Sequence, residues 1–176
     1  EAQHKKTYDS LMEKKVVLDP VHQLASDLEK RFLDTQSDLS SINRADVHTE
    51  TTRLAIGLFK EIERLDAQFK MFPIPIVHNF LIDTGFKDRG ACKHWAEDLL
   101  TYLRTVDRKY FDVTWGEANP QKADEHNVAV LIPRGLTFND GIFIDPWRTS
   151  GKAFWMRVTD DHHYPWKQWP DYGVYQ

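Results

Sequence analysis

The chain has 176 residues, 41% of them hydrophobic and 28% charged, and its formal net charge is −4. This length and composition are typical of one globular domain that can bury a substantial core. The small negative charge argues against nucleic acid as a partner, and no apolar run reaches the length of a membrane span.

The first half of the chain is predicted to form two amphipathic helices. One should begin at Asp19, a suitable N-cap, because Pro20 suits the first helical position. A second helix is expected from about Thr49 to Phe69. Two such helices of similar length should pack antiparallel. The apolar stripe of the first helix consists of Val21, Leu24, Ala25, Leu28 and Phe32, with Leu39 and Ile42 as an extension.

A proline-rich segment ends the helical half. In "FPIPIV" (72–77), Pro73 and Pro75 exclude a continuing helix. We therefore place a boundary here, between an N-terminal helical region at 1–71 and a second region at 72–176. Both are expected to belong to one compact domain.

The only cysteine of the chain, Cys92, begins the third predicted helix. That helix should run from about Gly90 to Val106, with Cys92 on its apolar face. The positive end of a helix dipole favours a thiolate over a thiol, and cationic neighbours act in the same direction. Those neighbours are Lys87, Arg89 and Lys93. The alternative is a thiol kept for packing, because free cysteine is often buried as a small hydrophobic residue.

Alternating patterns predict strands after the third helix. Three segments read as strands, "YFDVTWG", "HNVAVLIP" and "GIFIDPW", and "KAFWMRV" is a fourth candidate. We therefore expect an α+β fold in which the third helix packs on an antiparallel sheet. The aromatic tail "DDHHYPWKQWPDYGVYQ" is expected to wrap over the surface without regular structure.

A histidine and an aspartate are predicted to meet in this sheet. His126 shares a strand face with Val128 and Val130, and Asp145 shares the next strand's face with Phe143. A hairpin centred between residues 135 and 136 would pair 126 with 145. Directly opposed side chains have Cβ atoms about 5 Å apart, which suits an imidazole held by a carboxylate. A surface His–Asp pair without function is the alternative.

Cys92, His126 and Asp145 together fit a nucleophile, a base and a group that orients the base. Among the other histidines, His94 should point to a different helix face from Cys92, and His78 is left open. The three that lie in or beside surface helices are expected to be solvated: His4, His22 and His48.

The blocks "GACKHWA", "EHNVAVLIP" and "GIFIDPW", in this order, resemble the three core blocks of the transglutaminase-like superfamily of papain-like cysteine enzymes. The resemblance covers about residues 85–147. It implies a central helix packed on an antiparallel sheet. It also implies that Cys92 is the nucleophile, His126 the base and Asp145 the orienting carboxylate. Bacterial members are often hydrolases, which favours hydrolysis over transamidation.

Two departures from this family concern the site. Papain has a glutamine several residues before its cysteine, in the oxyanion hole, and none lies between Gln68 and Cys92 here. In addition, Asn127 follows the histidine where many members carry a small or aromatic residue. The Cys92 N–H could supply one oxyanion donor. The candidates for a second donor or a substrate contact are His78, Asn79, Trp95 and Trp147.

We expect a thiol enzyme that attacks the amide carbonyl of a protein or peptide substrate and needs no cofactor. The alternatives are a non-catalytic interaction module on the same fold and a redox-sensing thiol, although a resolving cysteine is lacking. The sequence does not indicate an oligomeric state. The chain starts without methionine, which is compatible with signal-peptide removal and slightly favours a periplasmic or secreted protein over a cytoplasmic one.

Two further features bear on ligand binding. The cluster "DDHH" (160–163) gathers metal-binding residue types, but no third spaced ligand group accompanies it, so no metal is expected. Six tryptophans are many for this length. They indicate core and tail packing or an aromatic-walled cleft that holds a peptide or sugar.

Overall fold

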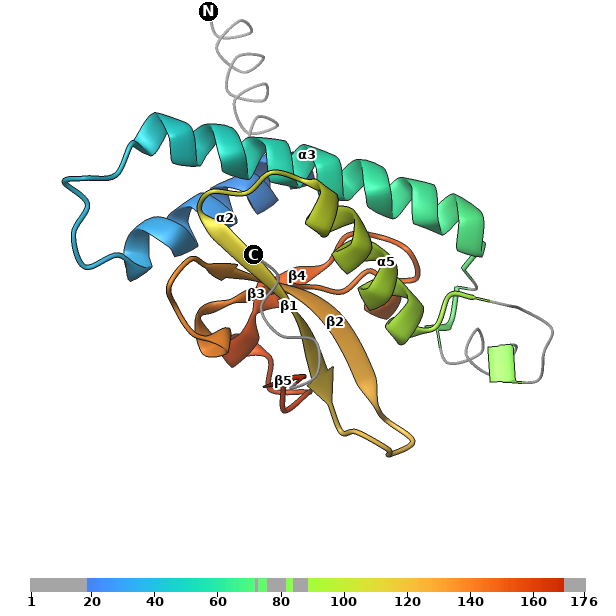
Figure 1. Ribbon diagram of the computed structural model, residues 1–176. Coiled ribbons are helices and arrows are strands. Elements are labelled where there is room, and N and C mark those ends of the chain that lie inside the picture. The colour runs from blue at the N-terminus through green and yellow to red at the C-terminus, as the bar shows by residue number, and fades with distance from the viewer. Residues whose placement is uncertain (1–18, 72, 76–81, 84–88, 170–176) are drawn as a thin grey trace, which may run out of the picture.

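The computed structural model describes residues 19–71, 73–75, 82–83 and 89–169. Its sheet is antiparallel and has five strands in the order β4-β3-β2-β1-β5. The helices gather beside the sheet, so the expected α+β class is confirmed (Figure 1). The helices are α2 (Pro20–Thr35), α3 (Arg44–Phe69) and α5 (Cys92–Thr105). The strands are β1 (Phe111–Ala118), β2 (His126–Pro133), β3 (Ile142–Ile144), β4 (Trp155–Arg157) and β5 (Lys167–Gln168).

Helices α2 and α3 differ in length, with 16 and 26 residues, so the expectation of similar helices was wrong. Asp19 caps α2 as predicted, accepting a hydrogen bond from the Val21 N–H at 3.1 Å. The helix ends before the expected extension, where Asp38 accepts from the Ser40 N–H and holds a turn. Asn43 then starts α3 earlier than the apolar pattern suggests, because its side chain accepts from the N–H groups of Ala45 and Asp46.

One apolar core lies between the three helices and one face of the sheet. It includes Leu58 of α3, Leu99 of α5, and Leu131 and Ile144 of the sheet, all at most 1% exposed. This core joins residues from both sides of the predicted boundary at residue 72. Phe72 and residues 76–77 of the proline-rich segment lie outside the described residues.

The pairing of β2 with β3 differs from the predicted register by two residues. Val130 lies opposite Phe143 rather than opposite Gly141. The connection is longer than a tight hairpin turn because a 3₁₀ helix, Phe138–Asp140, occupies part of it. Arg31 of α2 holds this helix through the Asp140 carbonyl at 2.7 Å and its carboxylate at 3.1 Å. A shift of two keeps every side chain on its predicted face.

The opposite face of the sheet carries a second, smaller core. Val128, Val130 and Phe143 pack there with Trp166 from the aromatic tail. The tail therefore covers this face, and the two residues of β5 pair with β1. The expectation that the tail lacks regular structure was wrong at these two residues.

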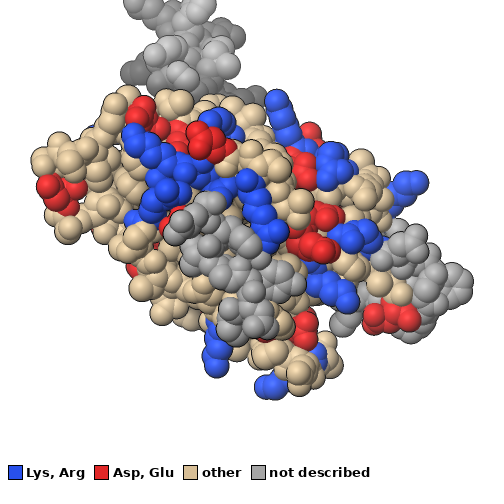
Figure 2. Space-filling model, viewed as in Figure 1, with Lys and Arg blue, Asp and Glu red and all other residues tan. Residues whose placement is uncertain are grey.

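The charged side chains of both signs are mixed on the face of the molecule that Figure 2 shows. Basic and acidic residues both occur across this face, and the formal net charge of the whole chain is −4. Within the described ranges, no helix combines the length and the apolar character that a membrane crossing requires.

Candidate functional site

Cys92 is the first residue of α5, and the backbone conformation just before it allows the helix to begin there. Gly90 has a φ of 121°, which a residue with a side chain rarely adopts. The Nδ1 atom of His94 then accepts from the N–H groups of Gly90 and Ala91, at 3.1 and 3.2 Å. Cys92 itself is 6% exposed, at the edge of the core, where the sequence placed it.

The cationic surroundings predicted for Cys92 are only partly present. Arg89 binds the carboxylates of Glu97 and Asp98, at 3.0 and 2.9 Å, so two anions offset its charge. Lys93 is exposed. Lys87 lies outside the described residues. Of the two predicted features, the position of Cys92 at the helix N-terminus is therefore found, whereas the cationic charge near it is largely offset.

His126 and Asp145 meet, although not as directly opposed residues. The imidazole Nε2 lies 2.7 Å from Asp145 Oδ2, and the two residues are 0% and 1% exposed. In the observed register Asp145 lies diagonal to His126, and diagonal neighbours remain within reach of long side chains. The predicted pair is therefore formed, through a different pairing of the strands.

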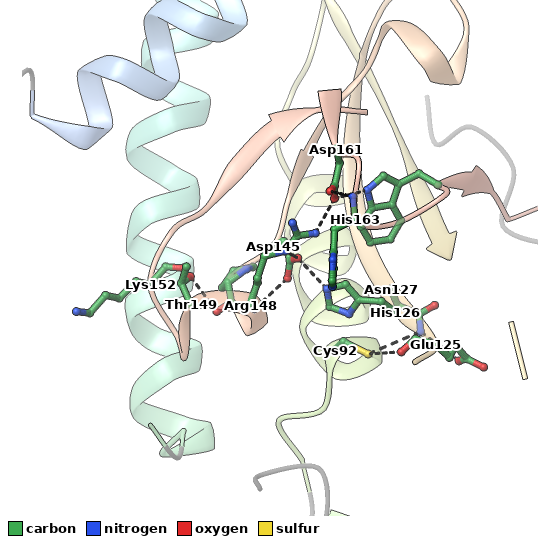
Figure 3. A network of polar contacts seen from close by, with 12 residues as sticks. Cys92, Glu125, His126, Asn127, Asp145, Arg148, Thr149, Lys152, Asp161 and His163 are labelled. Atoms are coloured by element: carbon green, nitrogen blue, oxygen red, sulfur yellow. Dashed lines mark hydrogen bonds and ion pairs between the residues drawn. The ribbon is translucent and has the colours of Figure 1, made fainter. Parts of the chain in front are cut away.

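The second ring nitrogen of His126 faces the thiol. In Figure 3 the Cys92 sulfur lies on the side of the imidazole away from Asp145. Nδ1 is buried and has no hydrogen-bond partner in the described part of the chain. Burial disfavours the imidazolium, but Asp145 and Cys92 outweigh it and raise the pKa of His126 to about 9. The ring is therefore largely protonated at neutral pH.

Three aromatic side chains enclose the imidazole. The ring centres of Trp147 and Tyr164 lie 4.7 Å from that of His126, and Trp166 lies at 5.5 Å. Trp147, a predicted substrate contact, thus packs directly on the His126 ring. The aromatic tail supplies the other two rings and keeps bulk water away from His126.

Arg148 and Asp161 extend the site, and sequence reasoning missed both. Arg148 donates from Nε to Asp145 Oδ2 at 2.9 Å and from its backbone N–H to Oδ1 at 3.2 Å. Its NH2 group binds Asp161 Oδ2 at 2.7 Å, which also accepts from the Trp166 indole at 2.9 Å (Figure 3). The only sequence signal was an arginine three residues after Asp145. Asp161 of the "DDHH" cluster thus holds an arginine and an indole, and the described residues contain no group arranged to hold a metal.

Asn127 approaches the sulfur directly. Its Nδ2 lies 3.9 Å from Cys92 Sγ, and its Oδ1 accepts from the Trp115 indole at 2.7 Å. The thiol also lies 3.9 Å from the Glu125 carbonyl oxygen. The indole fixes the amide so that an N–H group faces Cys92. The sequence pointed to this position only as a departure from the family pattern.

Of the predicted second oxyanion donors, the described part of the chain places only Trp95, and it lies away from the thiol. Trp95 is 1% exposed in the main core, with its ring edge-on to Phe69 at 5.0 Å. Its indole N–H has no hydrogen-bond partner among the described residues. His78 and Asn79 lie outside them.

A cleft of about 320 Å³ is lined by residues that contact the thiol. Asn127 and Glu125, which both contact Cys92 Sγ, belong to its wall, as does His94 of α5. Lys93 and Glu125 are exposed, so water reaches the cleft. A small molecule in this cleft would reach the residues around Cys92.

Comparisons with known proteins add no relative. A scan against models of protein families, a search of the curated proteins and a search of the solved structures each found no match. The resemblance to the transglutaminase-like superfamily therefore stays a prediction from sequence motifs, and so does the papain-like arrangement of the fold.

Proposed function

We propose that the protein is a thiol-dependent acyl-transfer enzyme that cleaves amide bonds of peptides or proteins. The observation that carries this proposal is the placement and the raised pKa of the His126 imidazole. Asp145 occupies its Nε2 at 2.7 Å, its Nδ1 faces Cys92 without another partner, and its pKa is raised to about 9. A protonated imidazole beside a thiol at a helix N-terminus stabilises the thiolate, which is the reactive nucleophile.

The first half of the reaction forms an acyl-enzyme. The Cys92 thiolate attacks the amide carbonyl carbon, and the carbonyl electron pair moves onto oxygen. When this tetrahedral oxyanion collapses, the carbon–nitrogen bond breaks and the His126 imidazolium gives its Nδ1 proton to the leaving amine. A thioester on Cys92 and a neutral imidazole remain.

The second half regenerates the thiolate. A water molecule attacks the thioester carbonyl while His126 accepts its proton, and the carbon–sulfur bond then breaks to release the acid. The exposed wall of the cleft supports water as the acceptor. Hydrolysis is therefore proposed over transfer to a second amine.

Two groups are placed to stabilise the oxyanion. Cys92 begins α5, so its N–H has no carbonyl partner within the helix. The Asn127 amide, held by Trp115, presents a second donor beside the sulfur. Arg148 holds the Asp145 carboxylate in place, and Asp145 in turn orients the imidazole.

A trapped acyl-enzyme tests the proposal. An activated ester such as p-nitrophenyl acetate should add one acetyl group to the parent protein, visible by intact mass, and the adduct should decay in water. Cys92→Ala should show no adduct while keeping the parent's circular dichroism spectrum. His126→Gln should acylate far more slowly. A folded parent that gains no adduct, or one that acylates as slowly as His126→Gln, would contradict the mechanism and favour an interaction module.

A further inference from the structure

The cleft beside Cys92 contains a buried carboxylate without a partner. Glu117 lies on β1, directly opposite Asn127 of β2, and is 8% exposed. It lines the 320 Å³ cleft and also a neighbouring cavity of about 760 Å³. Within the described residues its carboxylate makes no hydrogen bond and no ion pair. A carboxylate that faces a cleft without a cationic partner can attract a ligand of opposite charge.

A second carboxylate of the same wall also lacks a cation. Glu125 accepts from the Gln121 N–H at 2.8 Å and from Asn127 Nδ2 at 3.3 Å, and both donors are neutral. Burial and then the charge of Glu125 raise the pKa of Glu117. The two glutamates therefore form a negative pole at the strand side of the cleft.

The cations near the cleft do not neutralise this pole. Arg89, on the helix side, binds Glu97 and Asp98. Lys93 is exposed on the same side, and exposed Lys167 lies opposite Glu117 in the β1–β5 pair. Neither lysine forms a salt bridge with Glu117 in the described part of the chain. The charge of Glu117 thus remains available to a bound molecule.

Two indoles complete the recognition set. Trp115 and Trp169 line the same cleft as Glu117. The face of an indole attracts cations, and ammonium groups are commonly held by aromatic rings together with carboxylates. We propose that this cleft is a subsite for a primary ammonium group, such as a lysine side chain, on the substrate of Cys92. Calling the ligand a substrate rests on the proposed function, whereas the cation preference itself does not.

Charged thiol reagents test the subsite, because Cys92 is the only cysteine in the chain. The probes are 2-aminoethyl methanethiosulfonate, which carries a primary ammonium, and 2-sulfonatoethyl methanethiosulfonate, which is anionic. Their second-order rate constants are followed by intact mass. In Glu117→Gln the ratio of cationic to anionic rates should fall about fivefold or more. In the unmodified parent the same ratio should fall between 50 and 500 mM salt.

Glu63→Gln is the matched control, because it removes one negative charge from an exposed position on α3. Its rate ratio should stay within about twofold of the parent, since exposed charges at a distance are screened. A ratio in Glu117→Gln equal to that of Glu63→Gln would overturn the subsite. A parent without cation preference, or a thiol that reacts only after denaturation, would overturn it too.

The two proposals can fail separately. If Glu117 sets the charge preference but no acyl-enzyme forms, the cation subsite stands and the catalytic proposal fails. If the acyl-enzyme forms and turns over but Glu117→Gln leaves the ratio of cationic to anionic rates unchanged, the catalytic proposal stands and the subsite fails. Folding of each variant is checked by its melting temperature.

Discussion

His126 binds Asp145 through Nε2, at 2.7 Å, and this leaves Nδ1 as the ring nitrogen on the Cys92 side. Replacing Asp145 by asparagine keeps its shape but removes the charge and can present an N–H group to the ring. Turnover should fall at least about a hundredfold, and alkylation of Cys92 at neutral pH should slow. The measurement is acylation rate against pH. Asp160→Asn, at an exposed position nearby, is the control. A profile for Asp145→Asn that overlies the parent's would make Asp145 structural.

Cys92→Ala separates a catalytic thiol from a packing thiol. The side chain lies at the edge of the core and is 6% exposed, so losing its sulfur should cost about 1 kcal/mol or less of unfolding free energy. All acylation should disappear. Denaturant unfolding and ester turnover give the two readouts. An unfolded variant, or one with residual activity, would support the packing interpretation.

Asn127→Ala tests the amide that faces the sulfur. Removing one preorganised donor to an oxyanion costs on the order of a hundredfold in kcat, and KM should change much less. Trp115→Phe removes the indole N–H that fixes the Asn127 amide, so a smaller loss of kcat is expected. Steady-state kinetics on one amide substrate measure both. A change confined to KM would assign Asn127 to substrate binding instead.

The raised pKa of His126 predicts how stability depends on pH. The folded-state pKa is about 9, against a usual value of 6.5, so folding favours the protonated ring. This stabilisation is fully present below pH 6.5 and is lost as the pH rises through about 9. Unfolding free energy should therefore drop, by on the order of 2 kcal/mol more in the parent than in His126→Gln, between pH 6.5 and 9.5. Parallel curves for the two proteins would contradict the assignment.

Arg148→Lys tests a residue that acts through Asp145. Lysine keeps the charge but cannot bridge Asp145 and Asp161 as the guanidinium does. We expect kcat to fall about tenfold and the alkylation profile to shift towards that of Asp145→Asn. Arg157→Lys, an exposed arginine on β4, is the control. An unchanged pH profile with lowered stability would limit Arg148 to a structural role.

The sequence predicted those parts of the site that depend on local patterns. Cys92 at a helix start and His126 at a strand start follow from periodicity, which a register shift of two does not disturb. The contacts of Arg148 and Asn127 were not predictable in this way. They depend on a 3₁₀ turn after Asp145 and on the cross-strand position of Trp115, neither of which a hydrophobic pattern encodes.

The helix boundaries were missed for a related reason. The long reach of α3 depends on one capping side chain, Asn43, and the early end of α2 on the turn at Asp38. The β2–β3 register depends on Arg31, which is more than a hundred residues away in the chain. Polar contacts of this kind, local for the helix ends and distant for the strand register, are not encoded in hydrophobic spacing, which predicted the faces but not the pairings.

The enclosure of His126 by Tyr164 and Trp166 bears on how the protein matures. These rings come from a segment synthesised after the thiol, the base and the carboxylate. In a folding intermediate that has formed only the β1–β2–β3 meander, the imidazole is still exposed to water, because the tail does not yet cover that face of the sheet. Docking of the tail should therefore shield the imidazole from bulk water and change the rate at which Cys92 is alkylated. The alkylation rate of Cys92 during refolding would then report when the tail docks.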